Sequence, residues 1–319
     1  MSGPKISFIL VNYRTPDLTV ACIRSIQKNT LTSPHEIVLA DNASGDGSTE
    51  RIRAECPEVV MIEAPGNYGF GAGCNAAAAG ASGEYFYLLN TDTLLHEDSA
   101  AALARFLDGK PEAVAVGSAL HYPDGSHQAS ASYFPTLFSI VAGREVISGM
   151  LHRLWPAAAR LIMASPPEES LTAPVRVGWC VAASLMVRAE AYRAVGGFDE
   201  DFFMYAEEMD LCLRLSRLGE VWFTPETSVL HLEGASGGTE LNAMRLARIA
   251  AGHRLYFGKH YSRSKAWAFL FAWRLSSCIK YLVWRTVALV TRSPRHCNKA
   301  EWHRLFLQNF SRLTYPLPR

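Results

Sequence analysis

KISFILV (residues 5–11) is a short apolar run rich in β-branched side chains, which is typical of a strand buried in a parallel sheet. Similar runs recur along the first 120 residues: EIVLA (36–40), VVMIEA (59–64), EYFYLLN (84–90) and AVAVGS (113–118). Helix patterns separate them, near residues 16–29, 48–55, 71–81 and 97–108. This alternation predicts βαβ units, and therefore an α/β fold of Rossmann-like type with a mostly parallel central sheet flanked by helices.

The chain beyond residue 120 divides into an irregular middle and a helical end. The middle is expected to contain a helix near 144–163, a strand over 177–187, an amphipathic helix over 207–219 and two strands, VWFTP (221–225) and TSVLHL (227–232). We therefore expect a catalytic domain over residues 1–239, with halves of about 1–120 and 121–239, followed by a helical C-terminal region over residues 240–319.

Charge is distributed unevenly, although 31 Lys and Arg nearly balance 30 Asp and Glu in the 319 residues. The net charge is −12 over residues 1–239 and +13 over residues 240–319, which predicts that the basic end meets an anionic surface. Its longest apolar run, AWAFLFAW (266–273), is far shorter than the roughly 20 residues of a spanning helix.

Two residue sets in the basic end favour a lipid surface over nucleic acid. They are the arginines Arg274, Arg285 and Arg292, which are spaced to share one helical face, and the tryptophans Trp267, Trp273 and Trp284. The alternative is a helical layer that covers a sheet edge and has a solvated basic face. Seven scattered cysteines and a short apolar run at the N-terminus predict a reducing compartment and no signal peptide. We therefore expect a cytoplasmic protein bound peripherally to the inner face of the membrane.

Polar residues close several of the predicted parallel strands, and the carboxyl ends of such strands form the ligand-binding edge of an open sheet. Asn12, Asp41, Asn90 and Asp92 lie at these ends. The turn after Ala64 is rich in glycine, and there Asn67, Gly69 and Asn75 could face a phosphate or ribose at a helix N-terminus, although packing of the helix on the sheet explains the glycines equally well. No G-x-G-x-x-G follows the first strand, which excludes a nicotinamide site of Rossmann type.

Carboxylates in two places suit metal binding and acid–base chemistry. Asp92 stands beside Asn90 at a strand end, where it could bind Mg²⁺ or Mn²⁺, with His231 as a candidate further ligand or a structural histidine. The segment FDEDFFMYAEEMDLCLR (198–214) has acidic residues at a helix start beside aromatic residues. A carboxylate there could remove a proton from a sugar hydroxyl, and simple helix capping is the alternative.

Six motifs occur in a fixed order: SFILVNYRTPD (7–17), ADNASGDGS (40–48), NYGFGAGCN (67–75), LLNTDT (88–93), GGFDEDFFMYAEEMDLCLRLSRLG (196–219) and VLHLEGAS (229–236). Together they closely resemble the family 2 inverting glycosyltransferases of the GT-A fold. The nearest branch is similar to the rhamnosyltransferase-like enzymes of bacterial cell-wall and polysaccharide assembly. The resemblance covers about residues 5–240.

The resemblance implies roles for matching positions. Asp41 corresponds to the carboxylate that contacts the nucleotide base, with Asn12 and Asn67 nearby. Asp92 corresponds to the last Asp of the D-x-D motif, a metal ligand, although Asn90 stands where many members have the first Asp. His231 matches the metal-binding histidine.

The resemblance also implies an acid–base and acceptor site. Glu208 stands where the family has its catalytic base, usually an Asp, and Glu207 and Asp210 are kept as alternatives. Trp179 resembles a residue that lines the floor of the family's acceptor-binding site. Asp199 and Tyr205 of the acidic segment are expected to bind the acceptor together with Trp179.

These matches imply transfer of a sugar, most simply L-rhamnose from dTDP-L-rhamnose or another dTDP- or UDP-sugar, to a glycan or polyprenyl-linked glycan. The implied mechanism is a single in-line displacement with inversion. A nucleotidyltransferase acting on sugar phosphates and a non-catalytic nucleotide-sugar-binding subunit of an assembly complex remain as alternatives.

Overall fold

The computed structural model describes residues 5–30, 32–136, 139, 165–166, 168–232 and 243–312. The chain forms two compact units: Met1–Ser132 with Pro167–Glu200 and Glu207–Thr239, and Tyr133–Pro166 with Asp201–Ala206 and Glu240–Arg319. The helix expected near 144–163 and the domain boundary expected at 239/240 lie outside the described residues.

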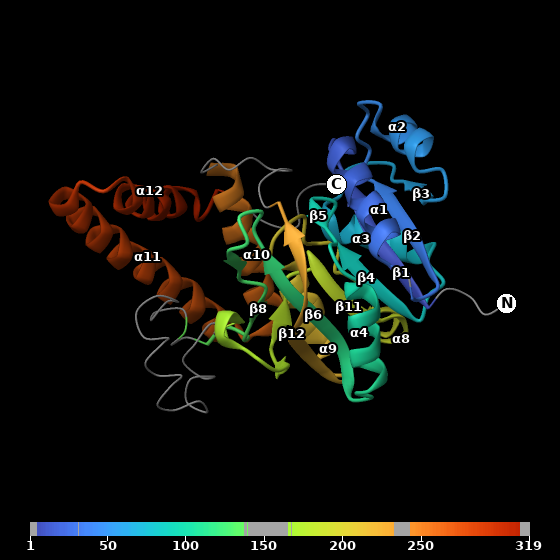
Figure 1. Ribbon diagram of the computed structural model, residues 1–319. Helices are drawn as coiled ribbons and strands as arrows, with labels where there is room; N and C mark the ends of the chain where they lie inside the picture. The colour runs from blue at the N-terminus through green and yellow to red at the C-terminus, as the bar shows by residue number, and fades with distance from the viewer. Residues whose placement is uncertain are drawn as a thin grey trace. The chain divides into compact units, whose positions relative to one another are not determined.

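The first unit is built on a sheet of ten described strands (Figure 1). These and a separate pair, β8 and β10, have the following bounds: β1 Ile6–Asn12, β2 His35–Asp41, β3 Val60–Glu63, β4 Tyr85–Leu89, β5 Thr93–Leu94, β6 Ala113–His121, β7 His127–Gln128, β8 Ala131–Ser132, β9 Val175–Arg176, β10 Trp179–Cys180, β11 Ser184–Arg188 and β12 Glu220–His231. The main order is β3-β2-β1-β4-β11-β6-β12-β5. The strands β3, β2, β1 and β4 are parallel, as the sequence predicts, and β11 runs antiparallel between β4 and β6.

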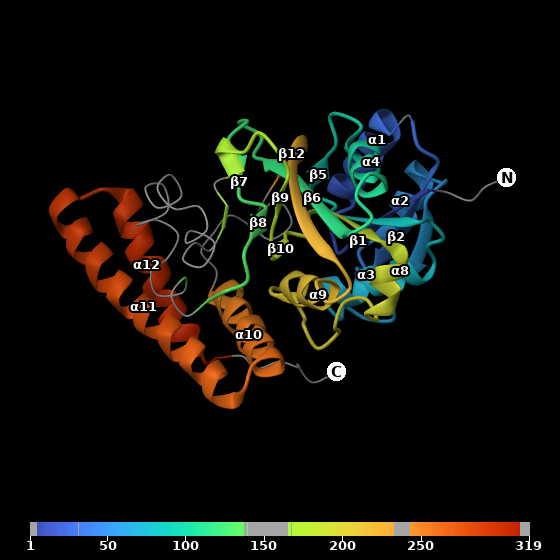
Figure 2. The same ribbon diagram turned by 90° about the horizontal axis from the view of Figure 1, so that it is seen from below.

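Helices cover both faces of this sheet. Their bounds are α1 Pro16–Asn29, α2 Ser48–Glu55, α3 Phe70–Ala79, α4 Ser99–Asp108, the 3₁₀ turn η1 Glu168–Ser170, α8 Ala189–Ala194 and α9 Glu207–Leu215. Figure 2 shows α1 and α4 on one face and α3, α8 and α9 on the other. On the α1 side, apolar residues such as Ile23 and Leu103 pack with Phe8 and Tyr87 in one buried core. The α/β fold and its flanking helices therefore match the sequence prediction.

Two predicted strand patterns differ from the structure. The run 177–187 forms two strands, because the chain turns between them and the Ser184 N–H donates to the carbonyl of Val181 (3.3 Å). The two strands expected over 221–232 are one strand, β12, whose register on β6 shifts between Thr224 and Ser228. Pro225 lies in this shift, and it lacks the N–H that a regular ladder needs, so the strand bulges there instead of ending.

The second unit contains the C-terminal helices α10 (Ala243–His260), α11 (Arg263–Thr291) and α12 (Pro294–Asn309), and the segment 201–206. Figure 1 shows α11 and α12 side by side, and their aromatic side chains pack together, with the Trp273 and Phe306 ring centroids 4.7 Å apart. Among the described helices, none combines the length and hydropathy that crossing a membrane requires.

The basic and aromatic face expected on residues 274–292 needs correction. Arg274 and Arg285 lie exposed on α11, but the helix ends at Thr291 and Arg292 follows it in the left-handed region, with a φ of 51°. Trp273 packs against Phe306, and Trp284 stacks on His296 with their centroids 5.5 Å apart. Trp267 is 66 % exposed, so it is the member of the tryptophan set that faces solvent.

Candidate active site

The ends of β1 and β2 are joined by a buried polar network. The Asn12 amide donates to Asp41 Oδ1 (2.6 Å), and the Ser44 hydroxyl donates to the same oxygen (2.7 Å). The Ser44 N–H donates to Asp41 Oδ2 (2.9 Å). Asn12 is 0 % and Asp41 3 % exposed, so both are fixed by the fold before any ligand binds. The structure thus brings together two of the residues predicted to bind donor.

The glycine-rich turn after β3 is tied to this network. Gly69 precedes α3 with a φ of 99°, and its N–H donates to Asn67 Oδ1 (3.1 Å). The Asn42 amide donates to the Gly69 carbonyl (2.9 Å), which attaches the turn to the end of β2. The helix-packing explanation holds for Gly73, where a Cβ would lie 2.7 Å from Val11 Cγ1. The turn therefore brings Asn67 and Gly69 to the edge occupied by Asp41.

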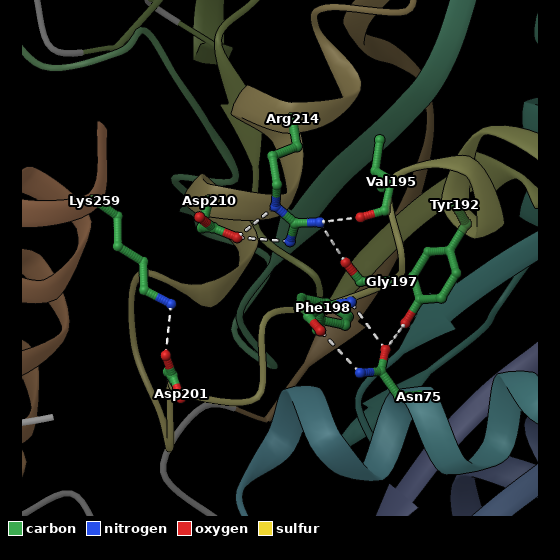
Figure 3. A network of polar contacts seen from close by, with 9 residues as sticks. All are labelled: Asn75, Tyr192, Val195, Gly197, Phe198, Asp201, Asp210, Arg214 and Lys259. Atoms are coloured by element: carbon green, nitrogen blue, oxygen red, sulfur yellow. Dashed lines mark hydrogen bonds and ion pairs between the residues drawn. The ribbon is translucent and has the colours of Figure 1, made fainter. Parts of the chain in front are cut away.

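The side chain of Asn75 forms hydrogen bonds with other residues of the protein. Its amide donates to the Phe198 carbonyl (2.9 Å), and its oxygen accepts from the Phe198 N–H (2.9 Å) and the Tyr192 hydroxyl (2.7 Å) (Figure 3). These bonds attach α3 to the loop that follows α8. This arrangement favours a structural role for Asn75 over the predicted role in donor binding.

Asp92 and His231 come together at the edge strand β5. The short strand pairs antiparallel with β12, placing His231 opposite Thr93, and the Leu232 N–H donates to the Asp92 carbonyl (2.8 Å). As a result, His231 Nε2 lies 3.2 Å from Asp92 Oδ1 and 3.5 Å from the Asn90 amide nitrogen.

Gln128 orients this histidine. Its Oε1 lies 3.0 Å from His231 Nδ1, which matches an N–H donated from Nδ1 and leaves the lone pair on Nε2, facing Asp92. Two adjacent ligands of an octahedral Mg²⁺ or Mn²⁺ stand about 3 Å apart, so the Asp92–His231 separation suits a shared cation. Within the described part of the chain, no three His, Cys, Asp or Glu side chains cluster as a metal site, so this pair needs ligands from substrate or water.

Glu207 and Glu208 begin α9 as a pair of desolvated carboxylates. The Oε2 atoms of both are buried and have no hydrogen-bond partner among the described residues. Burial raises the pKa of Glu208 from 4.5 to about 7. Burial, together with the charge of Glu208, raises the pKa of Glu207 well above its usual range. Glu207 is 5 % exposed and Glu208 is partly exposed, so Glu208 is better placed to reach an acceptor hydroxyl.

Asp210 forms an ion pair with Arg214 inside the protein. Arg214 donates to Asp210 Oδ2 from two nitrogens (2.6 and 2.8 Å) and also to the carbonyls of Val195 and Gly197 (Figure 3). Arg214 therefore attaches α9 to the loop after α8, and Asp210 orients its guanidinium from one turn earlier in the same helix. Asp210 is therefore engaged in an ion pair, whereas the Oε2 atoms of Glu207 and Glu208 have no partner in the described part of the chain.

The three residues expected to bind the acceptor lie in different parts of the chain and differ in burial. Trp179 is in β10, and its buried Nε1 has no partner among the described residues, so it can donate to a ligand oxygen. Asp199 is partly buried in the loop between α8 and α9. Tyr205 belongs to the segment 201–206 of the second unit and has a φ of 72°.

The sequence reasoning missed Gln128 and two aromatic residues. Tyr13 follows β1 and Tyr68 precedes α3, and they are 41 % and 44 % exposed. Exposed aromatic residues next to strand ends are a signal for stacking on a flat ligand, and their place beside Asn12 and Asn67 could have suggested it. Gln128 could not have been found, because its relation to His231 depends on sheet pairing.

Family models agree with this arrangement. The model described as glycosyl transferase family 2 matches residues 7–158, and the one described as glycosyl transferase family group 2 matches residues 85–311. The chain belongs to glycosyltransferase family 2. It therefore has the family membership that the six motifs predict.

Curated relatives and solved structures extend the comparison. An N-acetylglucosaminyl-diphospho-decaprenol L-rhamnosyltransferase of Mycobacterium tuberculosis is 32 % identical over 237 residues, covering 69 % of this chain and 73 % of the relative. The rhamnosyltransferase WbbL of Escherichia coli K12 is 28 % identical over 225 residues, covering 68 % and 71 %. The mannosyltransferase PcManGT of Pyrobaculum calidifontis, solved with GDP-Man and Mn²⁺, aligns with a TM-score of 0.59 at 14 % identity over 97 % of this chain and 86 % of that chain. The fold is thus the GT-A fold of this glycosyltransferase family.

Proposed function

We propose that the protein transfers L-rhamnose from dTDP-L-rhamnose to a polyprenyl-linked glycan, with inversion at the anomeric carbon. The observation that carries the proposal is Glu208, a partly exposed carboxyl at the start of α9. Burial raises its pKa to about 7, and its Oε2 has no hydrogen-bond partner among the residues that the structure describes. A base with a pKa near the working pH is what proton removal from a sugar hydroxyl requires. The rhamnosyltransferase relatives support the choice of sugar.

The nucleotide is assigned to the edge formed by Asn12, Asp41, Asn67 and Gly69. The buried Asp41 network offers a preorganised acceptor for the N–H of a pyrimidine base, and Tyr13 offers an exposed ring beside it. A preorganised polar pocket loses little entropy on binding. We therefore propose a dTDP- or UDP-sugar as the donor.

Asp92 and His231 would hold Mg²⁺ or Mn²⁺, with the Asn90 amide adjacent. The cation, when bound, supplies positive charge that stabilises the departing nucleoside diphosphate. Gln128 keeps the Nε2 lone pair of His231 directed at Asp92. The donor set of one carboxylate and one imidazole suits either metal.

The reaction is one in-line displacement. Glu208 accepts the proton of the acceptor hydroxyl, whose oxygen forms a bond to the anomeric carbon as the bond from that carbon to the diphosphate oxygen breaks. Burial and the charge of Glu208 raise the pKa of Glu207 well above its usual range, so Glu207 stays protonated beside the ionised base. Trp179 donates its Nε1–H, which has no partner among the described residues, to an acceptor oxygen. Because only one substitution takes place, the configuration inverts.

The C-terminal region 240–319 is assigned to the cytoplasmic face of the membrane, where a polyprenyl-linked acceptor would be found, and residues 1–239 to catalysis. Helix α11 presents an exposed apolar face that includes Trp267, Phe271, Leu275, Ile279 and Leu282. Exposed arginines, Arg274 and Arg285, lie beside this face. An apolar helix face bordered by arginines suits the surface of an anionic bilayer.

A thermal-shift panel tests the donor assignment, since a ligand that binds the folded state raises its melting temperature. We expect dTDP- and UDP-linked compounds to stabilise the protein and GDP- and ADP-linked compounds to leave it unchanged. Stabilisation by a purine nucleotide alone would contradict the assignment. Binding of dTDP-L-rhamnose with neither hydrolysis nor transfer would favour a non-catalytic subunit instead.

A further inference from the structure

Helix α10 contacts the segment 201–206, which leads directly into Glu207. The Arg248 guanidinium lies 4.9 Å from the ring centroid of Phe203. Lys259 Nζ donates to Asp201 Oδ2 (2.8 Å), as Figure 3 shows, and lies 5.5 Å from the ring centroid of Phe202. These contacts stabilise the position of the segment against one helix.

Gly252 lies between these two contacts, on the same side of α10. At about 100° per residue, positions 248, 252 and 259 fall within roughly 40° of one another. A Cβ on Gly252 would lie 3.0 Å from the Tyr205 carbonyl carbon, closer still to its oxygen, and 3.5 Å from Ala206 Cβ. The backbone of α10 therefore packs directly against the turn, with no room for a side chain.

The turn itself is strained. Tyr205 and Ala206 are consecutive non-glycine residues in the left-handed region, with φ values of 72° and 71°. Each such residue costs on the order of 1 kcal/mol or more, and it persists only where its surroundings enforce it. The contacts from α10 act on this turn, and Glu207 and Glu208 follow it immediately.

We propose that α10 is a clamp that positions the catalytic base, and that Gly252 is the positioning residue that lets the helix reach the turn. The inference rests on the proposed role of Glu208. It gives the C-terminal region a part in catalysis besides any role at a membrane. Reacting groups tolerate little displacement, since a misplacement of about 1 Å can cost on the order of 10²-fold in rate.

The substitution Gly252→Ala tests the clamp, and Gly258→Ala is its matched control. Both glycines are in α10, so both variants gain the same helix propensity, but a Cβ on Gly258 meets nothing within 4 Å. Amide hydrogen exchange over residues 202–209 reports on the turn without any need for activity. We expect Gly252→Ala to raise the rate of amide exchange over residues 202–209 about tenfold or more. It should also lower kcat on the order of 10²-fold and leave the affinity for dTDP unchanged.

The pH profile of kcat separates positioning from a general loss of fold. If the turn holds Glu208 in its buried position, displacing the turn exposes the carboxyl to water. The midpoint of the profile in Gly252→Ala should then move from about 7 toward the 4.5 of an exposed glutamate. Gly258→Ala should match the wild type in exchange, kcat and pH midpoint. Raised exchange with unchanged kcat, or equal losses in the two variants, would overturn the proposal.

Lys259→Met provides a second test if Gly252→Ala fails to fold. The side chains of Lys259 and Asp201 are 29 % and 39 % exposed, so their ion pair contributes at most about 1 kcal/mol to stability and the variant should fold. We expect faster exchange over residues 201–206 and a fall of about threefold to tenfold in kcat. An unchanged kcat here would overturn the proposal. A wild-type protein that transfers no sugar would refute the proposed function, whereas the exchange difference between the alanine variants would still decide whether α10 holds the turn.

Discussion

Replacing Glu208 by Gln should lower turnover and raise stability in the same variant. Burial raises the pKa of Glu208 from 4.5 to about 7, so ionising it in the folded protein costs about 3 kcal/mol relative to the unfolded chain. The sign follows from the direction of the shift. Below pH 4.5 the carboxyl is neutral in both states and has no effect, the cost grows between pH 4.5 and 7, and above pH 7 it is complete.

The glutamine variant lacks this cost at every pH. Its amide, like Glu208 Oε2, would have no hydrogen-bond partner among the described residues, which offsets part of the gain. We therefore expect a net increase of about 1–3 kcal/mol in the free energy of unfolding at pH 8. At pH 4 the variant and the wild type should have similar stability. Urea unfolding of both proteins at the two pH values measures the difference.

The same variant cannot accept a proton, so kcat should fall by about 10²–10⁴-fold while dTDP affinity stays the same. Glu208→Asp should be milder, because it keeps a carboxylate that is one methylene shorter. Glu208→Gln with most of its activity, or with lower stability than the wild type at pH 8, would refute the reasoning. In that case Glu207→Gln is the variant that would identify the base.

Three further outcomes are expected. Asp92→Asn should abolish most turnover and weaken Mn²⁺ binding by calorimetry, and full activity in excess EDTA would show that no metal is needed. Asp210→Asn should destabilise the protein by about 3 kcal/mol in urea unfolding, because it removes the buried negative charge that pairs with Arg214, whereas an unchanged midpoint would show that the ion pair is dispensable. Liposome flotation should show binding to anionic vesicles that Phe271→Glu reduces several-fold, and equal binding to zwitterionic vesicles would contradict an electrostatic contribution.

The sequence could predict the parallel half of the sheet because each element there has its own local signal. β1, β2 and β4 are apolar runs, and Pro16 begins α1 where its missing N–H does no harm. The residues at their carboxyl ends, Asn12 and Asp41, could then be placed together by topology alone. Such inferences need no knowledge of side-chain packing.

Other features depend on tertiary contacts that leave no local pattern. β5 has two residues, too few for any periodicity, yet its pairing with β12 is what joins Asp92 to His231. In the sequence, Trp284 is typical of a residue at a membrane interface. In the structure, the His296 ring of α12 stacks on it. Asn75 resembles a ligand-binding residue at a helix start, and only the position of Phe198 reveals its structural use.

Transfer from dTDP-L-rhamnose to N-acetylglucosaminyl-diphospho-polyprenol, with the anomeric configuration of the product read by NMR, tests the central claim most directly. We expect one rhamnosyl group in the product for each dTDP released, a configuration inverted relative to the donor, and no product from Glu208→Gln above about one hundredth of the wild-type rate. A product with retained configuration would contradict the single displacement. Transfer by Glu208→Gln at the wild-type rate would contradict the role of Glu208 as the base.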